Sequence, residues 1–100
     1  MATFISLMKL TEQGWKNIKD APKRIEQNEK ATVARGGKFT IYSTMGEYDY
    51  VTILEVPDEN VNDLSFLSSM LAYGSTYVCT SNTLRAFTKE EFVNAVNKIP

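Results

Sequence analysis

The sequence predicts a small α+β domain in which four antiparallel strands form one sheet, two helices cover one of its faces and a short third helix follows at the C-terminus. Two observations support this fold class. Segments rich in β-branched and aromatic residues alternate along the chain with segments whose apolar residues recur at helical spacing. The 100 residues, 43% of them hydrophobic and 23% charged, suffice for one modest core and are too apolar for a disordered protein. We therefore expect residues 1–100 to form a single domain.

The N-terminal part of the chain is predicted to be a strand followed by an interrupted helix. Residues 3–10 (TFISLMKL) have the composition of a strand. Thr11 suits the N-cap of a helix, and residues 20–22 (DAP) interrupt that helix, so we expect a kink and a renewed helix capped by Asp20. The apolar stripe of this helical segment comprises Trp15, Ile18, Pro22, Ile25 and Val33. Residues 36–37 (GG) then provide its C-terminal cap.

The middle of the chain is predicted to form a hairpin and a second helix. Residues 38–45 and 48–56 read as two strands joined by a tight connection that begins at Gly46. The second helix is expected to start at residues 57–58 (PD) and to end at Gly74, because apolar residues recur at helical spacing between these points.

The C-terminal quarter is predicted to be a strand followed by a short helix. Residues 75–87 form the fourth strand, and the polar pair at residues 81–82 (SN) favours a break within it. Residues 88–91 (TKEE) match the capping box that begins many helices, and this third helix runs out at Pro100. The resulting order β-α-β-β-α-β is that of the ferredoxin-like fold.

Both faces of the predicted sheet are apolar. Alternation along the first strand places Phe4, Met8 and Leu10 on one face and Ile5 and Leu7 on the other. The third strand shows the same two-sided pattern. Because two helices can cover only one face, the other face needs a second cover. The simplest cover is another copy of the chain, packed sheet to sheet about a two-fold axis, so we expect a homodimer or a multiple of dimers.

The composition argues against several classes of function. Eleven basic residues stand against twelve acidic ones, so the chain lacks the basic excess of a general nucleic-acid binder. No apolar run is long enough for a membrane span, and residues 1–10 lack the pattern of a signal peptide, so we expect a cytoplasmic protein. Without histidine and with a single cysteine, no transition-metal site is expected, and no cofactor motif is present.

Four separated stretches of the sequence resemble, in order and spacing, the GYD-domain family of small prokaryotic proteins. They are TEQGWKNIKDAPKR (11–24), GGKF (36–39), GEYDYVTILEVPDE (46–59) and NTLRAFTKEEF (82–92). The name-giving motif is altered, because Glu47 separates Gly46 from Tyr48-Asp49. The resemblance implies a ferredoxin-like fold of the dimeric α/β-barrel kind and no particular activity. Other dimeric α/β barrels include cofactor-independent monooxygenases, muconolactone-type isomerases and haem-handling proteins, a likeness of fold alone.

Asp49 is the first candidate site residue, and two interpretations stay open. Its carboxylate could accept backbone N–H groups of the Gly46 turn or pair with a nearby cation. It could instead act as a general base in a pocket, with a pKa raised by its aromatic neighbours. Tyr48 and Tyr50 are expected to share one strand face, as wall of a pocket or of a dimer interface, with Asp49 pointing the opposite way.

Three other residues are candidates for the site. Arg85, on the fourth strand, could form an ion pair with Asp49 or Glu55, or bind a substrate anion. Trp15 and Tyr42 are candidates for a ligand pocket, although the apolar stripe favours a core position for Trp15. Two further residues have ordinary interpretations: Cys79 as an inert buried thiol and Arg24 as a surface residue.

Three functions remain open at this point. The first, which we favour, is a non-enzymatic small-molecule binder or sensor with its pocket between sheet and helices. The second is a cofactor-independent enzyme, monooxygenase-like or isomerase-like, acting on a small apolar or aromatic substrate through Asp49, tyrosine hydroxyls and arginine. The third is a purely structural oligomeric module. A pocket that holds Asp49 or Arg85 with unpaired polar atoms would favour the first two, and a closed core would favour the third.

Overall fold

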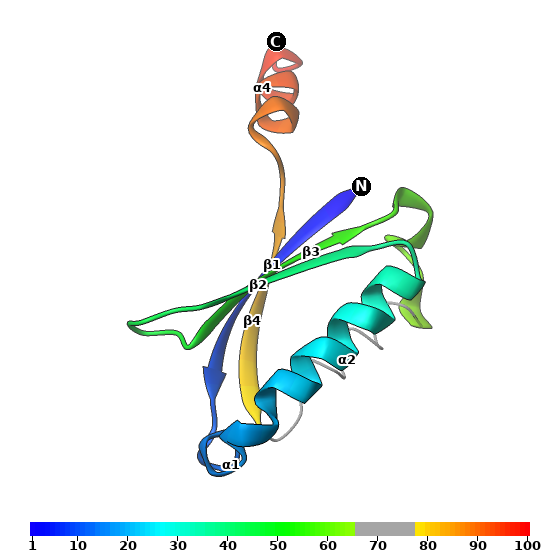
Figure 1. Ribbon diagram of the computed structural model, residues 1–100. Coiled ribbons are helices and arrows are strands. Elements are labelled where there is room, and N and C mark those ends of the chain that lie inside the picture. Colours follow the sequence, from blue (N-terminus) through cyan, green and yellow to red (C-terminus); the bar gives the residue numbers. More distant parts are fainter. Residues whose placement is uncertain (66–77) are drawn as a thin grey trace.

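The computed structural model describes residues 1–65 and 78–100, and these residues form one four-stranded antiparallel sheet with a long helix on one side (Figure 1). The strands are β1 (Ala2–Leu10), β2 (Lys38–Ser43), β3 (Tyr50–Val56) and β4 (Cys79–Ala86). Their order in the sheet is β2-β3-β1-β4, with every neighbouring pair antiparallel. The predicted α+β class and antiparallel sheet are confirmed, and this strand order is consistent with a ferredoxin-like fold.

The predicted kink in the first helical segment is present. Helix α1 (Glu12–Lys16) is followed by a 3-10 turn (Ile18–Asp20) and then by the long helix α2 (Ala21–Ala34). Thr11 caps α1, since its side chain accepts the N–H of Gly14. Asp20 stands at the N-cap position of α2 but makes no side-chain capping hydrogen bond. That expectation was wrong because the preceding 3-10 turn gives Asp20 a helical backbone, whereas a capping side chain needs an extended one.

Helix α2 ends as its glycines predict. Gly36 has a φ of +83°, and its N–H donates to the carbonyl of Val33 (2.9 Å). The N–H of Gly37 donates to the carbonyl of Thr32 (3.0 Å). These paired bonds form a Schellman cap, which turns the chain sharply into β2.

Three strand predictions need correction. The hairpin strands end at Ser43 and begin at Tyr50, because residues 44–49 form the connection instead of continuing the ladder. The break predicted at residues 81–82 does not occur, since both residues pair with β1. The described part of the fourth strand begins at Cys79 and ends at Ala86, so Val78 and Phe87 were wrongly included in it, and residues 75–77 lie outside the described residues.

The predicted second helix lies half within and half outside the described residues, because the described range ends at Ser65. Within the described part, a 3-10 turn (Asp58–Asn60) follows Pro57 where the helix was expected to start. The predicted end at Gly74 lies in the segment that the structure does not describe.

The sheet has a covered face and a second face on which no helix of residues 1–65 and 78–100 lies, which we call the open face. The covered face is the side on which strand residues enclose a cavity together with α2; these residues are Met8, Leu10, Phe39, Ile41, Tyr50, Thr52 and Cys79. Val56 is fully buried on this side and packs against Phe4, Leu54 and Ala31 of α2. The open face carries the alternate side chains of the same strands. Its apolar members are Ile5, Leu7, Tyr42, Val51, Ile53 and Leu84.

The C-terminal helix α4 (Lys89–Asn97) extends away from the sheet (Figure 1). Its predicted capping box is present: Thr88 Oγ1 accepts the N–H of Glu91, and Glu91 Oε1 accepts the N–H of Thr88. That second hydrogen bond lowers the pKa of the Glu91 carboxyl. No α4 residue is buried. The radius of gyration, 15.0 Å, exceeds the value of about 13 Å expected for 100 residues, as an extended arm requires.

Candidate functional site

Asp49 joins the β2–β3 hairpin to the end of β1. Its backbone N–H donates to the carbonyl of Met8 (2.8 Å), and its carbonyl accepts the N–H of Thr44 (2.9 Å). Its carboxylate Oδ2 accepts the N–H of Leu10 (2.8 Å). Because the β1–β3 ladder ends where Met8 faces Tyr50, the carboxylate supplies Leu10 with the acceptor that the neighbouring strand lacks. The predicted role as a backbone acceptor is supported, but its partner is β1 and not the Gly46 turn.

The expected arrangement of the two tyrosines is wrong. Tyr48 precedes β3, and the ammonium of Lys9 lies 5.3 Å from the centre of its ring. Tyr50 and Asp49, by contrast, line the same groove. The cause is the irregular start of β3. The N–H of Asp49 donates to Met8, and Tyr50 is the register partner of the same residue, so side chains alternate regularly only from Tyr50 onward.

A groove of about 410 Å³ lies between the helical segment and the hairpin; we call it the outer groove. Its wall combines Trp15, Ile18 and Ile25 from the helical side with Thr44, Asp49 and Tyr50 from the hairpin. Trp15 is 55% exposed, so its indole is a groove wall and not a core residue.

Helix α1 is fixed against Val78, directly before the start of β4, and this contact positions Trp15. The N–H of Thr11 donates to the carbonyl of Val78 (2.9 Å). Gly14 is buried, and a Cβ placed on it would clash with the same carbonyl oxygen. Glycine is therefore required for this close approach, which holds the neighbouring Trp15 at the groove.

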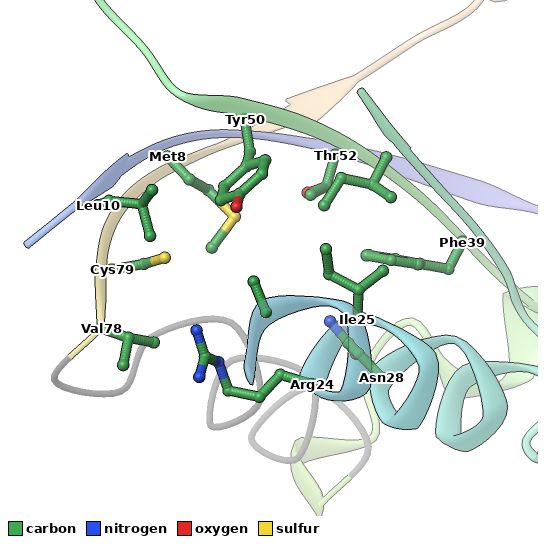
Figure 2. Close-up of a pocket in the computed structure, with 12 residues that line it drawn as sticks. Met8, Leu10, Arg24, Ile25, Asn28, Phe39, Tyr50, Thr52, Val78 and Cys79 are labelled. Carbon is green, nitrogen blue, oxygen red and sulfur yellow. The ribbon is translucent and has the colours of Figure 1, made fainter. Parts of the chain in front are cut away.

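A smaller cavity of about 50 Å³ lies deeper, between α2 and the covered face; we call it the inner cavity (Figure 2). Its polar lining residues are Arg24, Asn28, Tyr50, Thr52 and Cys79. The outer groove and the inner cavity share a wall made by Leu10, Ala21, Ile25 and Tyr50. A ligand in the groove would therefore lie next to the polar groups of the cavity.

Two titratable groups at the inner cavity have raised pKa values. Burial raises the pKa of the Tyr50 phenol, with smaller upward contributions from Cys79 and Asp49. Burial also raises the pKa of the Cys79 thiol, to which Asp49 adds. The positive charge of Arg24, which lines the same cavity, opposes both shifts. Both groups are consequently protonated at neutral pH.

The structure brings together three of the predicted site residues, namely Trp15, Asp49 and Tyr50. Tyr42 lies on the open face and is 57% exposed, so it is no part of the groove. Tyr48 is likewise absent from the groove wall.

Arg85 has a different environment from the one expected. Its guanidinium lies over two rings, 5.5 Å from the centre of Phe4 and 4.4 Å from that of Phe87. It also donates to the carbonyl of Thr3 (3.2 Å). Within the described ranges it forms no ion pair with Asp49 or Glu55. Asp49 lies at the other end of the sheet, beside Leu10, and Glu55 lies on the opposite face, where it pairs with Lys38.

Arg24 and Asn28 are site residues that the sequence reasoning missed. Arg24 was expected on the surface but is half-buried and lines the inner cavity. Asn28 lies one helical turn further along on the same side. A usable signal was present, because Arg24 directly precedes Ile25 of the apolar stripe and follows the buried Ala21 by three positions.

Neither a metal cluster nor a membrane-spanning helix was found in the part of the chain that the structure describes. Among those residues, no three His, Cys, Asp or Glu side chains are grouped to hold a metal ion. No helix of the described ranges is both long and apolar enough to cross a bilayer.

Comparison with known proteins identifies a family. The model of the GYD domain matches residues 4–96, almost the entire chain. Searches of curated proteins and of solved structures found no match. The resemblance seen in the sequence is therefore confirmed over a longer stretch than the four motifs covered, and the chain belongs to the GYD-domain family.

Proposed function

We propose that this protein is a homodimeric small-molecule-binding or sensing module whose ligand lies in the outer groove. The observation that carries the proposal is the position of Asp49 beside Trp15 and Tyr50 in that groove. Asp49 Oδ2 is bound to the N–H of Leu10, whereas Oδ1 accepts no hydrogen bond from the described residues. An oriented carboxylate oxygen facing a partly aromatic groove is suited to bind a ligand N–H or O–H group.

The groove has the size and lining of a small-molecule site. Its volume of about 410 Å³ falls within the common range for ligand pockets, roughly 300–1,000 Å³. Apolar side chains make most of the wall, and Ser43, Thr44 and Asp49 supply polar atoms at one end. This combination fits a small apolar or aromatic ligand that carries at least one hydrogen-bond donor.

The open face supports the homodimer part of the proposal. The strand register places Leu84, Ile5 and Ile53 in one cross-strand row. Leu7 and Val51 lie in the next row, beside Tyr42. A sheet-to-sheet contact of about 800 Å² per subunit would gain on the order of 20 kcal/mol of gross hydrophobic free energy per subunit. Association costs reduce this gain heavily but leave the dimer favoured. Such a dimer would be of the α/β-barrel kind.

The enzymatic alternative has less support. A nucleophilic role for Cys79 or Tyr50 would need a lowered pKa, and burial raises the pKa of both groups. Asp49 keeps the position that a general base would need, so catalysis on a bound ligand is the second candidate. Arg85 is stacked on rings away from the groove and contributes to neither function.

Native mass spectrometry of the protein purified from its own host would test ligand binding directly. We expect a retained small molecule, and fluorescence of Trp15 should respond when that molecule is added back, because this is the only tryptophan of the chain. Asp49→Asn should weaken the binding. Asp58→Asn is the matched control, because this substitution removes the same charge far from the groove, beside the N-terminal amine. A groove that retains and binds nothing would contradict the proposal.

A further inference from the structure

The position of Arg24 suits the binding of an anion. It projects from α2 and is half-buried, and Figure 2 shows its guanidinium directed toward Val78 and Cys79 at the edge of the inner cavity. The side chain lies in the first turns of a 14-residue helix that packs on the sheet, so its origin is fixed. It is therefore held at the cavity and does not trail freely in solvent.

The guanidinium has no acidic partner in the described part of the chain. The ion pairs found there involve other cations, and the acid nearest to Arg24 along α2, Glu26, is paired with Lys30 (3.1 Å). Asp49, the acid of the neighbouring groove, bonds instead to the N–H of Leu10. Among the described residues, no acid therefore competes with an anionic ligand for the guanidinium of Arg24.

The surroundings of this charge are mostly apolar. Met8, Leu10, Ile25 and Val78 line the cavity on which the guanidinium borders. A half-buried guanidinium loses part of its hydration in such a place, and the loss is recovered only when an anion binds it. A carboxylate fits best, because it accepts two parallel N–H bonds from the planar guanidinium.

We propose that Arg24 is the anion-binding residue of this site and that the ligand is a small organic acid, a carboxylate on an apolar or aromatic body. This inference rests on the proposed ligand-binding function and names its ligand class. The inner cavity, about 50 Å³, has room for only a few heavy atoms, which suits a carboxylate group. The body of the acid then occupies the outer groove, which adjoins the cavity at the lining residues that both spaces share.

Two further residues complete the recognition. Asn28, one turn after Arg24, lines the same cavity and can donate a side-chain N–H to the second carboxylate oxygen. Asp49, at the other side of Tyr50, repels a second negative charge and accepts from a donor on the body of the acid. The site therefore selects a monocarboxylate over a dicarboxylate of similar size.

Matched pairs of acids and amides test the inference. The probes are benzoate and phenylacetate with their neutral isosteres benzamide and phenylacetamide, titrated into the protein while Trp15 fluorescence and heat are recorded. We expect each acid to bind at least tenfold more tightly than its amide. Arg24→Gln should weaken acid binding by about 10- to 100-fold and leave amide binding unchanged, so that acid and amide bind alike. Arg24→Lys should restore part of the difference, because it keeps the charge without the two parallel donors.

The control is Lys23→Gln, an exposed neighbour on α2 whose loss changes the net charge of the protein by the same amount. It should leave acid binding unchanged, and circular dichroism should show all three variants folded. Equal binding of acids and amides by the wild-type protein would overturn the inference and leave the proposed function standing. Binding of neither class would overturn both.

Discussion

The two faces of the sheet differ in a way that separates their functions. The open face is aliphatic at its centre, where Ile5, Leu7, Val51 and Ile53 adjoin across β1 and β3. The covered face, which lies under α2, carries Tyr50 and Thr52 in the same central part of the sheet. On this face Ser6 of β1 also forms a hydrogen bond with Thr83 of β4. A face that must exclude water against another sheet gains from being uniformly apolar. A face that binds a ligand needs polar groups among apolar ones.

Breaking the open face should have the largest effect. Leu7→Lys places a charge at the centre of the proposed dimer contact, where Leu7 faces Val51 on the neighbouring strand. We expect the dissociation constant of the dimer to rise by at least about 100-fold, because a buried unpaired charge costs several kcal/mol. Light scattering at micromolar concentration should give the mass of a dimer for the wild type and of a monomer for Leu7→Lys. A wild-type protein that is a stable monomer would contradict the proposal that the open face is a dimer interface.

Changing Asp49 tests the polar side of the comparison. Asp49→Asn keeps the shape of the side chain but removes the charge that strengthens its bond to Leu10 N–H. The free energy of unfolding should fall by about 1–3 kcal/mol at neutral pH, measured by chemical denaturation. An unchanged or raised stability would show that this carboxylate is held at a cost to folding, as a site residue often is, and would favour a catalytic role.

Sequence patterns captured the local structure well where one residue type decides it. The Thr88 capping box, the Gly36 cap and the break before Pro22 each depend on a side chain and its immediate backbone. The two-sided apolar pattern of β1 likewise follows from simple alternation.

The site was harder to predict because tertiary contacts determine it. Alternation placed Asp49 opposite the two tyrosines, but the hydrogen bond to Met8 shifts the start of β3 and brings Asp49 to the groove. Arg24 looked like an ordinary surface cation in the sequence, since its half-burial depends on how α2 lies on the sheet. Arg85 was expected to pair with an acid and stacks on Phe4 and Phe87 instead.

A third region sharpens the comparison because it covers neither face. Helix α4 is well capped, yet none of its residues is buried, and Phe92 is 64% exposed. A chain that ends at Phe87 should therefore lose less than about 1 kcal/mol of unfolding free energy, the size expected for surface changes. A larger loss in denaturation, concurrent with a lower mass by light scattering, would mean that α4 packs against a second copy and extends the open-face contact.

The smallest expected effect concerns Cys79 on the covered face. Its raised pKa means that the folded protein favours the neutral thiol. The contribution of the neutral thiol to the free energy of unfolding is therefore complete below the ordinary pKa of 9.0, and it is lost as the pH rises through the pKa of the folded protein. Alkylation by iodoacetamide at pH 8 should accordingly be slower than for an unfolded chain.

Arg24→Gln should slow this alkylation further, by roughly two- to threefold, because the charge that lowers the Cys79 pKa is gone. Lys23→Gln serves again as the control of equal charge. A faster reaction in Arg24→Gln, with unchanged rates in urea, would place the guanidinium away from the thiol.

Gly14 has a consequence for how the binding specificity of this protein can change. The absence of a side chain there lets α1 rest directly on the carbonyl of Val78, and Trp15 follows in the next position. Any larger residue would push α1 away from Val78 and move the indole outward. The width of the groove would then depend on a residue that does not contact the ligand. Ligand preference could then shift through a single methyl group at a position hidden from solvent, which a comparison restricted to groove-lining residues would overlook.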